Sequence, residues 1–309
     1  LTLVTLKMTN ITKKNMSKVI KNSPDNNVIL QDTQSKADER NISICRVGIK
    51  DIKYPVEISD INDSRQHVSG NFTMSVSLPP EVKGTHMSRF VSILDERKKP
   101  LSINNFDELI NEVSKKLDSD KSYVSLDFNY FRRKKAPVTK VESFLDYAVS
   151  FIGEKNNEIL NKFIKVTVPV TSLCPCSKNI SDYGAHNQRS HISALIRVKK
   201  NIWIEEIIEM LEEQASCQIY GLLKRPDEKF VTEEAYNNPK FVEDIIRDLA
   251  LSLNKDERVS AYKIESENFE SIHNHSAYAF IEKDKTKECV KGKDNVSFLK
   301  LSQLKSSCH

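Results

Sequence analysis

The chain has 309 residues, of which 39% are hydrophobic and 29% are charged, and it is long enough to bury a substantial core in one large or two smaller domains. Its net charge of +4 is small for this length, so no nucleic-acid partner is required. Four lysines interrupt the first twenty residues. These residues therefore form neither a signal-peptide core nor a membrane span, and we expect a cytoplasmic protein with no membrane partner.

The N-terminal residues 1–45 are rich in Asn, Lys, Ser and Asp and show little periodicity, which predicts a mobile arm. Order is expected to begin near Ile44. Apolar residues alternate from Phe72 to Leu78 and two prolines follow, which predicts a half-buried strand that ends there. Helical spacing of the apolar residues in 106–117 predicts a helix, with Asn104 or Asn105 as its cap.

The centre and the C-terminal part of the chain alternate in the same way between strand and helix patterns. Strand patterns occupy 123–131, 144–152, 163–170, 259–267 and 277–281, and helical patterns occupy 204–211 and 241–253. Two strands, helices and two strands thus occur about twice, which favours an α+β fold over a succession of βαβ units. The tail, residues 286–309, is polar.

The sequence from Val166 to Val198 contains the most informative pattern. An apolar run predicts a strand that ends near Cys174, Pro175 and Cys176, and after a polar loop with His186 a second run begins at His191. A lone cysteine at a strand end is more often a small buried hydrophobe. A thiolate and an imidazole at the open ends of neighbouring strands, however, bind a divalent ion and leave positions for water. No second cysteine pair is present for a four-thiolate zinc site.

Several motifs occur in the same order as in one enzyme family. SLCPCSKNISDYGAHNQRS, together with GTHMSRF, LDFNYFRRKKAPVT, LLKRPDEKFVTEEAYNNPKFVEDIIRDLA and ESENFESIHNHSAYAF, closely resembles the type IB GTP cyclohydrolase I family. The resemblance spans about residues 46–282. One departure is Asn179, where the family pattern has an acidic residue, but this position lies outside the proposed metal ligands.

The resemblance implies an α+β fold of tandem tunnelling-fold units, which are antiparallel sheets with helices on one face that assemble into barrels across subunits. We expect a first unit at 46–152 and a second unit, with the metal site, at 153–285. The family is a homotetramer with active sites at subunit interfaces, so residues of neighbouring chains are expected to meet.

The implied reaction converts GTP and water to 7,8-dihydroneopterin triphosphate and formate, the first step of folate and pterin biosynthesis. The enzyme is a hydrolase that acts on cyclic amidine C–N bonds, with one divalent ion per site, Zn, Mn or Fe. The family match assigns the ion to Cys174, His186 and Glu228. By itself Glu228 would be a solvated carboxylate. One thiolate, one imidazole and one carboxylate do not select zinc strictly.

The remaining roles also follow from the resemblance. His273 would transfer protons near the metal, and Cys176 would lie beside it, although a structural role is as plausible. Because His273 and His275 alternate, one is expected to point to each face of a strand. Glu243 would be a buried anchor for the guanine edge, although its pattern also fits a solvated helix position. The cations that are candidates for the triphosphate are Lys178, Arg189, His86 and Arg89.

Two alternatives stay open. One is a metal-stabilised purine-binding protein without turnover, which would bind GTP and release no formate. The other is a tunnelling-fold enzyme of another reaction, such as the nitrile reductase of that superfamily. That enzyme uses a nucleophilic cysteine and nicotinamide without metal, so the arrangement of Cys174 and His186 argues against it.

Overall fold

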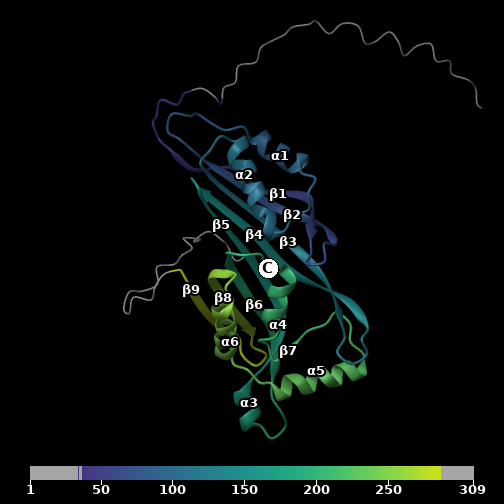
Figure 1. Ribbon diagram of the computed structural model, residues 1–309. Helices are drawn as coiled ribbons and strands as arrows, with labels where there is room; N and C mark the ends of the chain where they lie inside the picture. Colours follow the sequence, from purple (N-terminus) through teal and green to yellow (C-terminus); the bar gives the residue numbers. More distant parts are fainter. Residues whose placement is uncertain (1–33, 35–36, 287–309) are drawn as a thin grey trace, which may run out of the picture.

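The computed structural model describes Gln34 and residues 37–286, which form one antiparallel sheet with helices (Figure 1). The strand order is β1-β2-β3-β4-β5-β6-β8-β9, and β7 pairs with β5. The strands are β1 (Ile44–Ser59), β2 (Arg65–Leu78), β3 (Lys121–Lys135), β4 (Glu142–Asn156), β5 (Ile159–Leu173), β6 (Asn187–Val198), β7 (Cys217–Gln218), β8 (Val259–Phe269) and β9 (Ser276–Asp284). The helices are α1 (Met87–Glu96), the 3-10 turn η1 (Ile103–Asn105), α2 (Phe106–Lys116), α3 (Pro175–Ile180), α4 (Ile204–Glu212), α5 (Arg225–Asn237) and α6 (Val242–Lys255).

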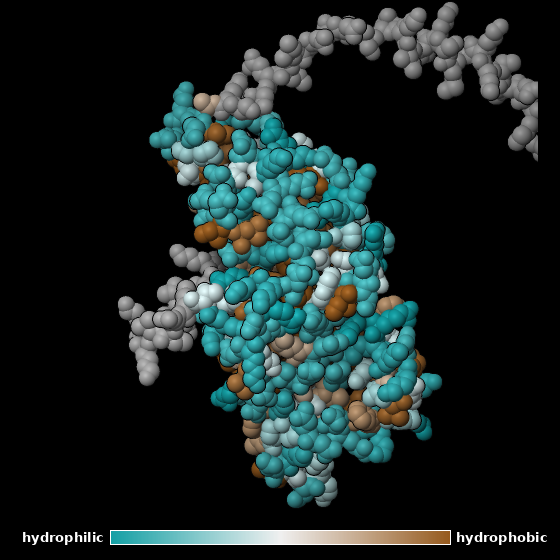
Figure 2. Space-filling model, viewed as in Figure 1, coloured by the Kyte–Doolittle hydropathy of each residue, from teal (hydrophilic) through white to brown (hydrophobic). Residues whose placement is uncertain are grey.

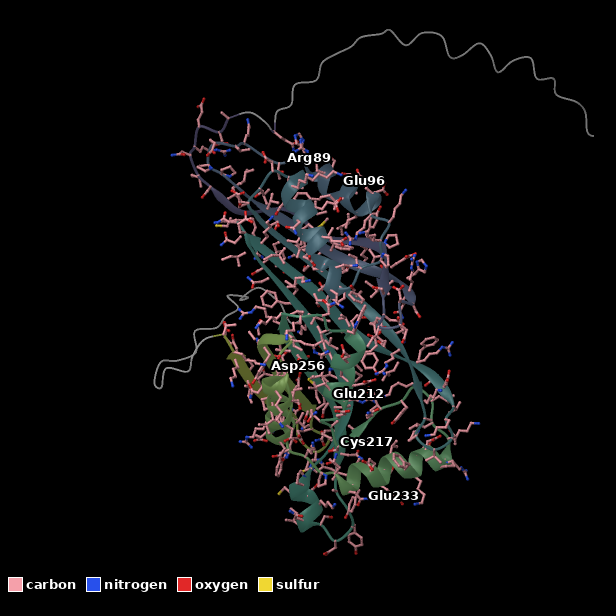
Figure 3. All side chains as sticks on the ribbon, in the orientation of Figure 1. Arg89, Glu96, Glu212, Cys217, Glu233 and Asp256 are labelled. Atoms are coloured by element: carbon pink, nitrogen blue, oxygen red, sulfur yellow. The ribbon has the colours of Figure 1, made fainter. Side chains whose placement is uncertain are left out.

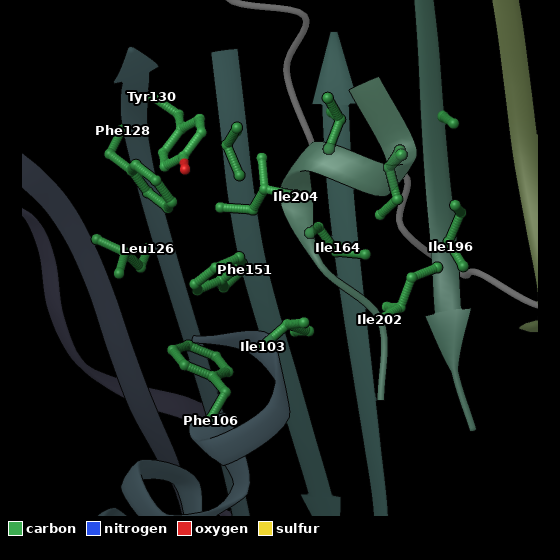
Figure 4. Close-up of a cluster of buried hydrophobic side chains, with 14 of the residues drawn as sticks. Ile103, Phe106, Leu126, Phe128, Tyr130, Phe151, Ile164, Ile196, Ile202 and Ile204 are labelled. Carbon is green, nitrogen blue, oxygen red and sulfur yellow. The ribbon is translucent and has the colours of Figure 1, made fainter. Parts of the chain in front are cut away.

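The main core lies between one face of the sheet and helices α1, α2, α4 and α6, whose buried apolar residues join a single cluster. Figure 4 shows its centre, where Phe151 meets Phe106 and Phe128 edge to face, with ring centroids 5.6 Å and 5.1 Å apart. Helix α2 approaches β4 so closely that a Cβ atom on Gly153 would lie 2.0 Å from Cδ1 of Ile110. Edge-to-face aromatic pairs and this close approach fix the helix layer on the sheet.

The predicted α+β architecture is confirmed. Each half of the chain contains two strands, helices and two strands, and the second half adds the short strand β7 and the short helix α3. All strand pairs of the sheet are antiparallel. This is the arrangement of tandem tunnelling-fold units that the resemblance implies. The division at 152 and 153 stays a prediction. Those two residues lie within β4, and the chain turns from β4 to β5 a little later, at 157–158.

The predicted strands at 72–78, 123–131, 144–152, 163–170, 259–267 and 277–281 and the predicted helices at 106–117, 204–211 and 241–253 are all present. Asn105 is the N-cap of α2, but its side chain makes no capping bond there and instead accepts a hydrogen bond from the backbone of Ser102. Of the predicted arm 1–45, only Gln34 and residues 37–45 are described, and in this part Ala37 forms a β-bridge with Val82. The predicted tail 286–309 lies outside the described residues except for Thr286. Among the helices of the described residues, none is long and apolar enough to cross a membrane.

The hairpin of β3 and β4 extends beyond the residues that pair with the flanking strands β2 and β5. The pairing of β2 with β3 ends at Asp127, and the pairing of β5 with β4 begins at Ala148. Residues 128–135 and 142–147 therefore continue as a two-stranded extension, which we call the β3–β4 arm. Helix α5 extends between the tip of this arm and α3 (Figure 1).

Candidate metal centre and substrate site

Cys174 and His186 lie side by side where the loop that contains α3 connects β5 to β6. Leu173 pairs with Asn187 as the last register pair, and the N–H of Cys174 donates to the carbonyl oxygen of His186 at 3.1 Å. Cys174 also begins the short helix α3, where its Sγ accepts a hydrogen bond from the N–H of Ser177 at 3.4 Å. This contact fixes the orientation of the sulfur atom, and a cysteine sulfur is a ligand that a borderline-soft divalent ion accepts.

The imidazole of His186 is oriented by a chain of hydrogen bonds. The amide nitrogen of Gln188 lies 3.1 Å from Oγ of Ser172 and 3.4 Å from Oε1 of Glu270. These contacts turn Oε1 of Gln188 toward Nδ1 of His186, at 3.0 Å. Nδ1 is therefore assigned as the protonated nitrogen, and Nε2 is left as the ligand atom, as in histidines that bind metal.

The loop between β8 and β9 covers the same end of the sheet. Oγ of Ser271 lies 3.4 Å from Nδ1 of His186, and His273 is two residues further along. The prediction that His273 and His275 point to opposite faces of a strand is wrong, because both lie in the exposed loop. Their rings stack on one another with centroids 5.1 Å apart and an angle of 14° between the planes.

Glu228 lies elsewhere in the chain, exposed on the first turn of α5. The other end of α5 contacts α3, because Nζ of Lys178 donates to the carbonyl oxygen of Tyr236 and lies 4.3 Å from its ring centroid. The eight residues from Glu228 to Tyr236 correspond to about 12 Å of helix. Within Gln34 and residues 37–286, no three His, Cys, Asp or Glu side chains are grouped as a metal site. One chain therefore supplies a thiol and an imidazole, which are suitable ligands for a borderline-soft divalent ion. The carboxylate of Glu228 in the same chain is not grouped with them.

Glu243 is exposed on the first turn of α6, so the prediction of a buried anchor is wrong for a single chain. The apolar residues of α6 face the core, and this orientation leaves Glu243 on the outer side. The start of α6 is nevertheless close to the metal candidates, because the N–H of Lys240 donates to the carbonyl oxygen of Leu173 at 3.1 Å. Leu173 immediately precedes Cys174.

Similar proteins decide the family. The family model described as "Type I GTP cyclohydrolase folE2" matches residues 30–279. The chain belongs to this family. Proteins named "GTP cyclohydrolase FolE2" from Nitrosococcus oceani, Nitrosomonas eutropha and Thiobacillus denitrificans are 58%, 55% and 52% identical to it. The alignments cover 83%, 84% and 85% of this chain and 96%, 97% and 98% of the relatives.

Solved structures give a weaker likeness. A hyper-thermostable AgUricase mutant aligns with a TM-score of 0.49 and 6% identity, over 79% of this chain and 93% of the other. Uricase from Arthrobacter globiformis aligns with a TM-score of 0.43 and 8% identity, over 81% and 96%.

The cations that were expected to bind the triphosphate fall into two groups in this FolE2 chain. Lys178 on α3 and the exposed Arg189 on β6 lie at the Cys174 end of the molecule. His86 and Arg89 lie at the start of α1 in the first half of the chain. In Figure 3 the label of Arg89 is at the opposite end of the molecule from Glu233 on α5. A single chain therefore does not bring all four together.

Cys176 is exposed on α3, two residues after Cys174. Two residues near His186, Gln188 and Ser271, were not predicted from the sequence. Gln188 follows His186 by two positions and starts the period-two pattern of β6, so its side chain lies on the same side as His186. That spacing was the available signal. Ser271 had no comparable signal, because its contact depends on how the β8–β9 loop folds over β6.

Proposed function

We propose that this FolE2 family member is a type IB enzyme that converts GTP and water to 7,8-dihydroneopterin triphosphate and formate, the first step of folate and pterin biosynthesis. The observation that carries the proposal is the pairing of Cys174 with His186, whose Nδ1 is hydrogen-bonded to Gln188. This arrangement supports the proposal because it brings a thiol and an imidazole to the same end of two paired strands. The names of relatives that are 52–58% identical support the same reaction.

The proposed cofactor is one divalent ion per site, Zn, Mn or Fe, held by Cys174, His186 and Glu228. When bound, such an ion would supply a water molecule with a lowered pKa as the nucleophile for C8 of guanine. Since Glu228 lies at the far end of α5 from α3 in its own chain, we assign the carboxylate of each site to a second copy of the chain. The mixed donor set suits several metals.

The other residues would bind substrate and move protons. Glu243 would accept two hydrogen bonds from the donor groups of the guanine edge, which adenine lacks. His273, in the loop next to His186, would exchange protons with the opening and closing rings. Cys176 would lie beside the substrate. Lys178 and Arg189 would contact the triphosphate from one chain, and His86 and Arg89 from a neighbouring copy.

The proposed assembly is a homotetramer whose sheets join into barrels across subunits, located in the cytoplasm, without nucleic-acid or membrane partners. Strands β1 and β9 are the two ends of the sheet in the described chain, and each can pair with another copy. Large apolar side chains are exposed around α5 and the β3–β4 arm, and Figure 2 shows hydrophobic patches at that end. They include Val138, Phe144, Leu222 and Phe230. Exposed apolar groups of this kind favour an interface.

The test is to incubate the metal-loaded protein with GTP and to measure formate together with pterin fluorescence after oxidation. Both products are expected in equal amounts. A Cys174→Ala protein with an unchanged circular dichroism spectrum is the control, and it should yield neither product. Tight GTP binding without formate would contradict the proposed reaction and would favour a purine-binding protein.

A further inference from the structure

We infer that Asp227 is a positioning residue that fixes Glu228 at the place where a metal ion is bound. The inference rests on the proposed role of Glu228 as a ligand. Asp227 is fully buried, whereas its neighbour Glu228 is exposed. A buried carboxylate one residue before an exposed one, on the first turn of a helix, attaches that turn to the protein and leaves the next side chain free to bind.

The carboxylate of Asp227 accepts four hydrogen bonds. Oδ1 accepts from the N–H groups of Val138 and Thr139, both at 2.9 Å. Oδ2 accepts from the hydroxyl of Thr139 at 2.6 Å and from the N–H of Lys224 at 3.0 Å. A carboxylate has about four acceptor sites, so these donors use its full capacity. Three of the four donors belong to the tip of the β3–β4 arm, and the fourth caps α5 itself.

Helix α5 is thereby held at both ends by different parts of the molecule. Its C-terminal end is held by the contact of Lys178 with Tyr236 and by Asn238, which donates to the carbonyl oxygen of Ala215 at 2.9 Å. Its N-terminal end is held by the hydrogen bonds of Asp227 with Val138 and Thr139 at the tip of the arm. The segment before the helix also lies against the arm, since a Cβ atom on Gly221 would be 2.5 Å from the carbonyl oxygen of Phe144.

Loss of the Asp227 contacts should therefore displace Glu228 without touching the thiol and imidazole. In an Asp227→Asn protein the amide group has nearly the same size as the carboxylate. In either orientation, however, its NH2 faces at least one backbone N–H whose hydrogen bond the carboxylate had accepted. A displacement of about 1 Å is enough to impair a preorganised ligand set.

The experiment titrates the purified protein with Co²⁺ alone and records its absorption spectrum without GTP. Asp227→Asn and Thr139→Val are compared with Glu228→Gln, which removes the ligand itself. In these three variants the charge-transfer band from the Cys174 thiolate to Co²⁺ should persist. The visible bands of the bound Co²⁺ should differ from those of the original protein. The affinity for Co²⁺ should fall by about 10–100-fold in Asp227→Asn, the range for groups that orient metal ligands. Thr139→Ser keeps the hydroxyl and should restore the original spectrum and affinity.

Glu206→Gln is the matched control. Glu206 is also the third residue of a helix, accepts a hydrogen bond from the backbone N–H of Trp203 at 2.9 Å and binds Arg258. Its helix carries no proposed ligand, so the substitution should lower the thermal midpoint and leave the cobalt spectrum unchanged. An effect of Glu206→Gln equal to that of Asp227→Asn would reduce Asp227 to a general stabilising residue.

The outcomes separate the two proposals. A cobalt spectrum that changes with Glu228→Gln but not with Asp227→Asn overturns the positioning role and leaves the ligand assignment intact. A spectrum that does not change with Glu228→Gln overturns the ligand assignment, and the positioning role with it. Equal changes in both variants, with the folded state retained at the temperature of the titration, support both.

Discussion

The imidazole of His186 depends on residues that touch no proposed ligand atom. Glu270 and Ser172 hold the amide of Gln188 in one orientation, and Gln188 in turn holds Nδ1 of His186. In one tautomer Nε2 is available as a ligand, and in the other it carries the proton. The hydrogen-bond chain therefore stabilises the form of His186 that binds metal before any metal arrives.

The first prediction concerns Gln188. Gln188→Leu removes the acceptor of Nδ1 and should weaken Zn²⁺ binding by about 10–100-fold, the effect typical of a group that orients a metal ligand. Competition with a chromophoric chelator measures the affinity. Gln66→Leu is the control, because Gln66 also makes two hydrogen bonds through its amide, to the backbone of Phe131. Equal losses in both variants would refute a specific role of Gln188.

The second prediction concerns Glu243. Glu243→Gln keeps the shape but replaces one acceptor with a donor, so GTP binding should weaken by about 1.5–3 kcal/mol, the range for hydrogen bonds to a charged group. To prevent turnover, the affinity is measured in Cys174→Ala protein with and without the second substitution. Glu257→Gln, at an exposed carboxylate that pairs with Lys200, is the control. Loss of metal from otherwise unmodified Glu243→Gln protein would instead place Glu243 among the ligands.

The sequence was sufficient to predict that Cys174 and His186 are neighbours. They flank the loop that connects two antiparallel strands, and residues in these positions lie side by side. For Glu243 the helical pattern indicated the exposed position that is observed, and only the resemblance implied a buried one. The sequence could not predict the orientation of His273 and His275. Alternation holds only within a strand, and β9 begins after both residues, at Ser276.

At the scale of elements, helices with a continuous apolar stripe were predictable and the others were not. Helices α2, α4 and α6 bury apolar residues on successive turns. Helix α5 buries only Asp227 and Ala235, so its sequence has no helical apolar period. It is held instead by hydrogen bonds at its ends. Helix α3 has only six residues, too few for a period to be recognised.

A third prediction tests how the connection from α6 to β8 is stabilised. Hydrogen bonds from the Arg258 side chain lower the pKa of Asp256, although burial opposes this shift. The carboxylate therefore stabilises the folded state fully above the unfolded pKa of about 3.9. This contribution is lost as the pH falls through the lower pKa of the folded state. Asp256→Asn should be less stable than the original protein at neutral pH.

Urea unfolding at a series of pH values measures this difference. The gap in the free energy of unfolding between the two proteins should be constant from about pH 7 to pH 5 and should narrow in stronger acid, where the carboxyl group becomes neutral as well. A gap that does not change with pH would show that the charge of Asp256 contributes nothing and that only its shape matters.

At the scale of the whole molecule, the described chain contains all the proposed site residues without bringing them together. Cys174 and His186 lie at one end, Glu228 lies at the other end of α5, and His86 and Arg89 lie in the first half. This separation was not predictable from the sequence, because the order of motifs along the chain does not reveal which copies of a symmetric assembly meet.

The fourth prediction follows from this separation. If each site takes Cys174 from one copy and Glu228 from another, Cys174→Ala and Glu228→Gln proteins should be inactive alone and should regain activity when unfolded and refolded together. Random pairing of equal amounts gives an intact site in roughly a quarter of cases. Formate release measures the recovery, and each variant refolded alone is the control. No recovery despite mixed oligomers would assign all ligands to one chain.

The attachment of α5 to the β3–β4 arm also affects what recombination between related genes would produce. The arm is encoded in the first half of the gene, and α5 is encoded in the second. A recombination event that joins two relatives between β4 and β5 would keep the apolar pattern of both halves and leave every proposed metal ligand in place. It would nevertheless combine an arm tip and a helix start that were not selected together. Chimaeras crossed at that turn should therefore fold more often than they bind metal.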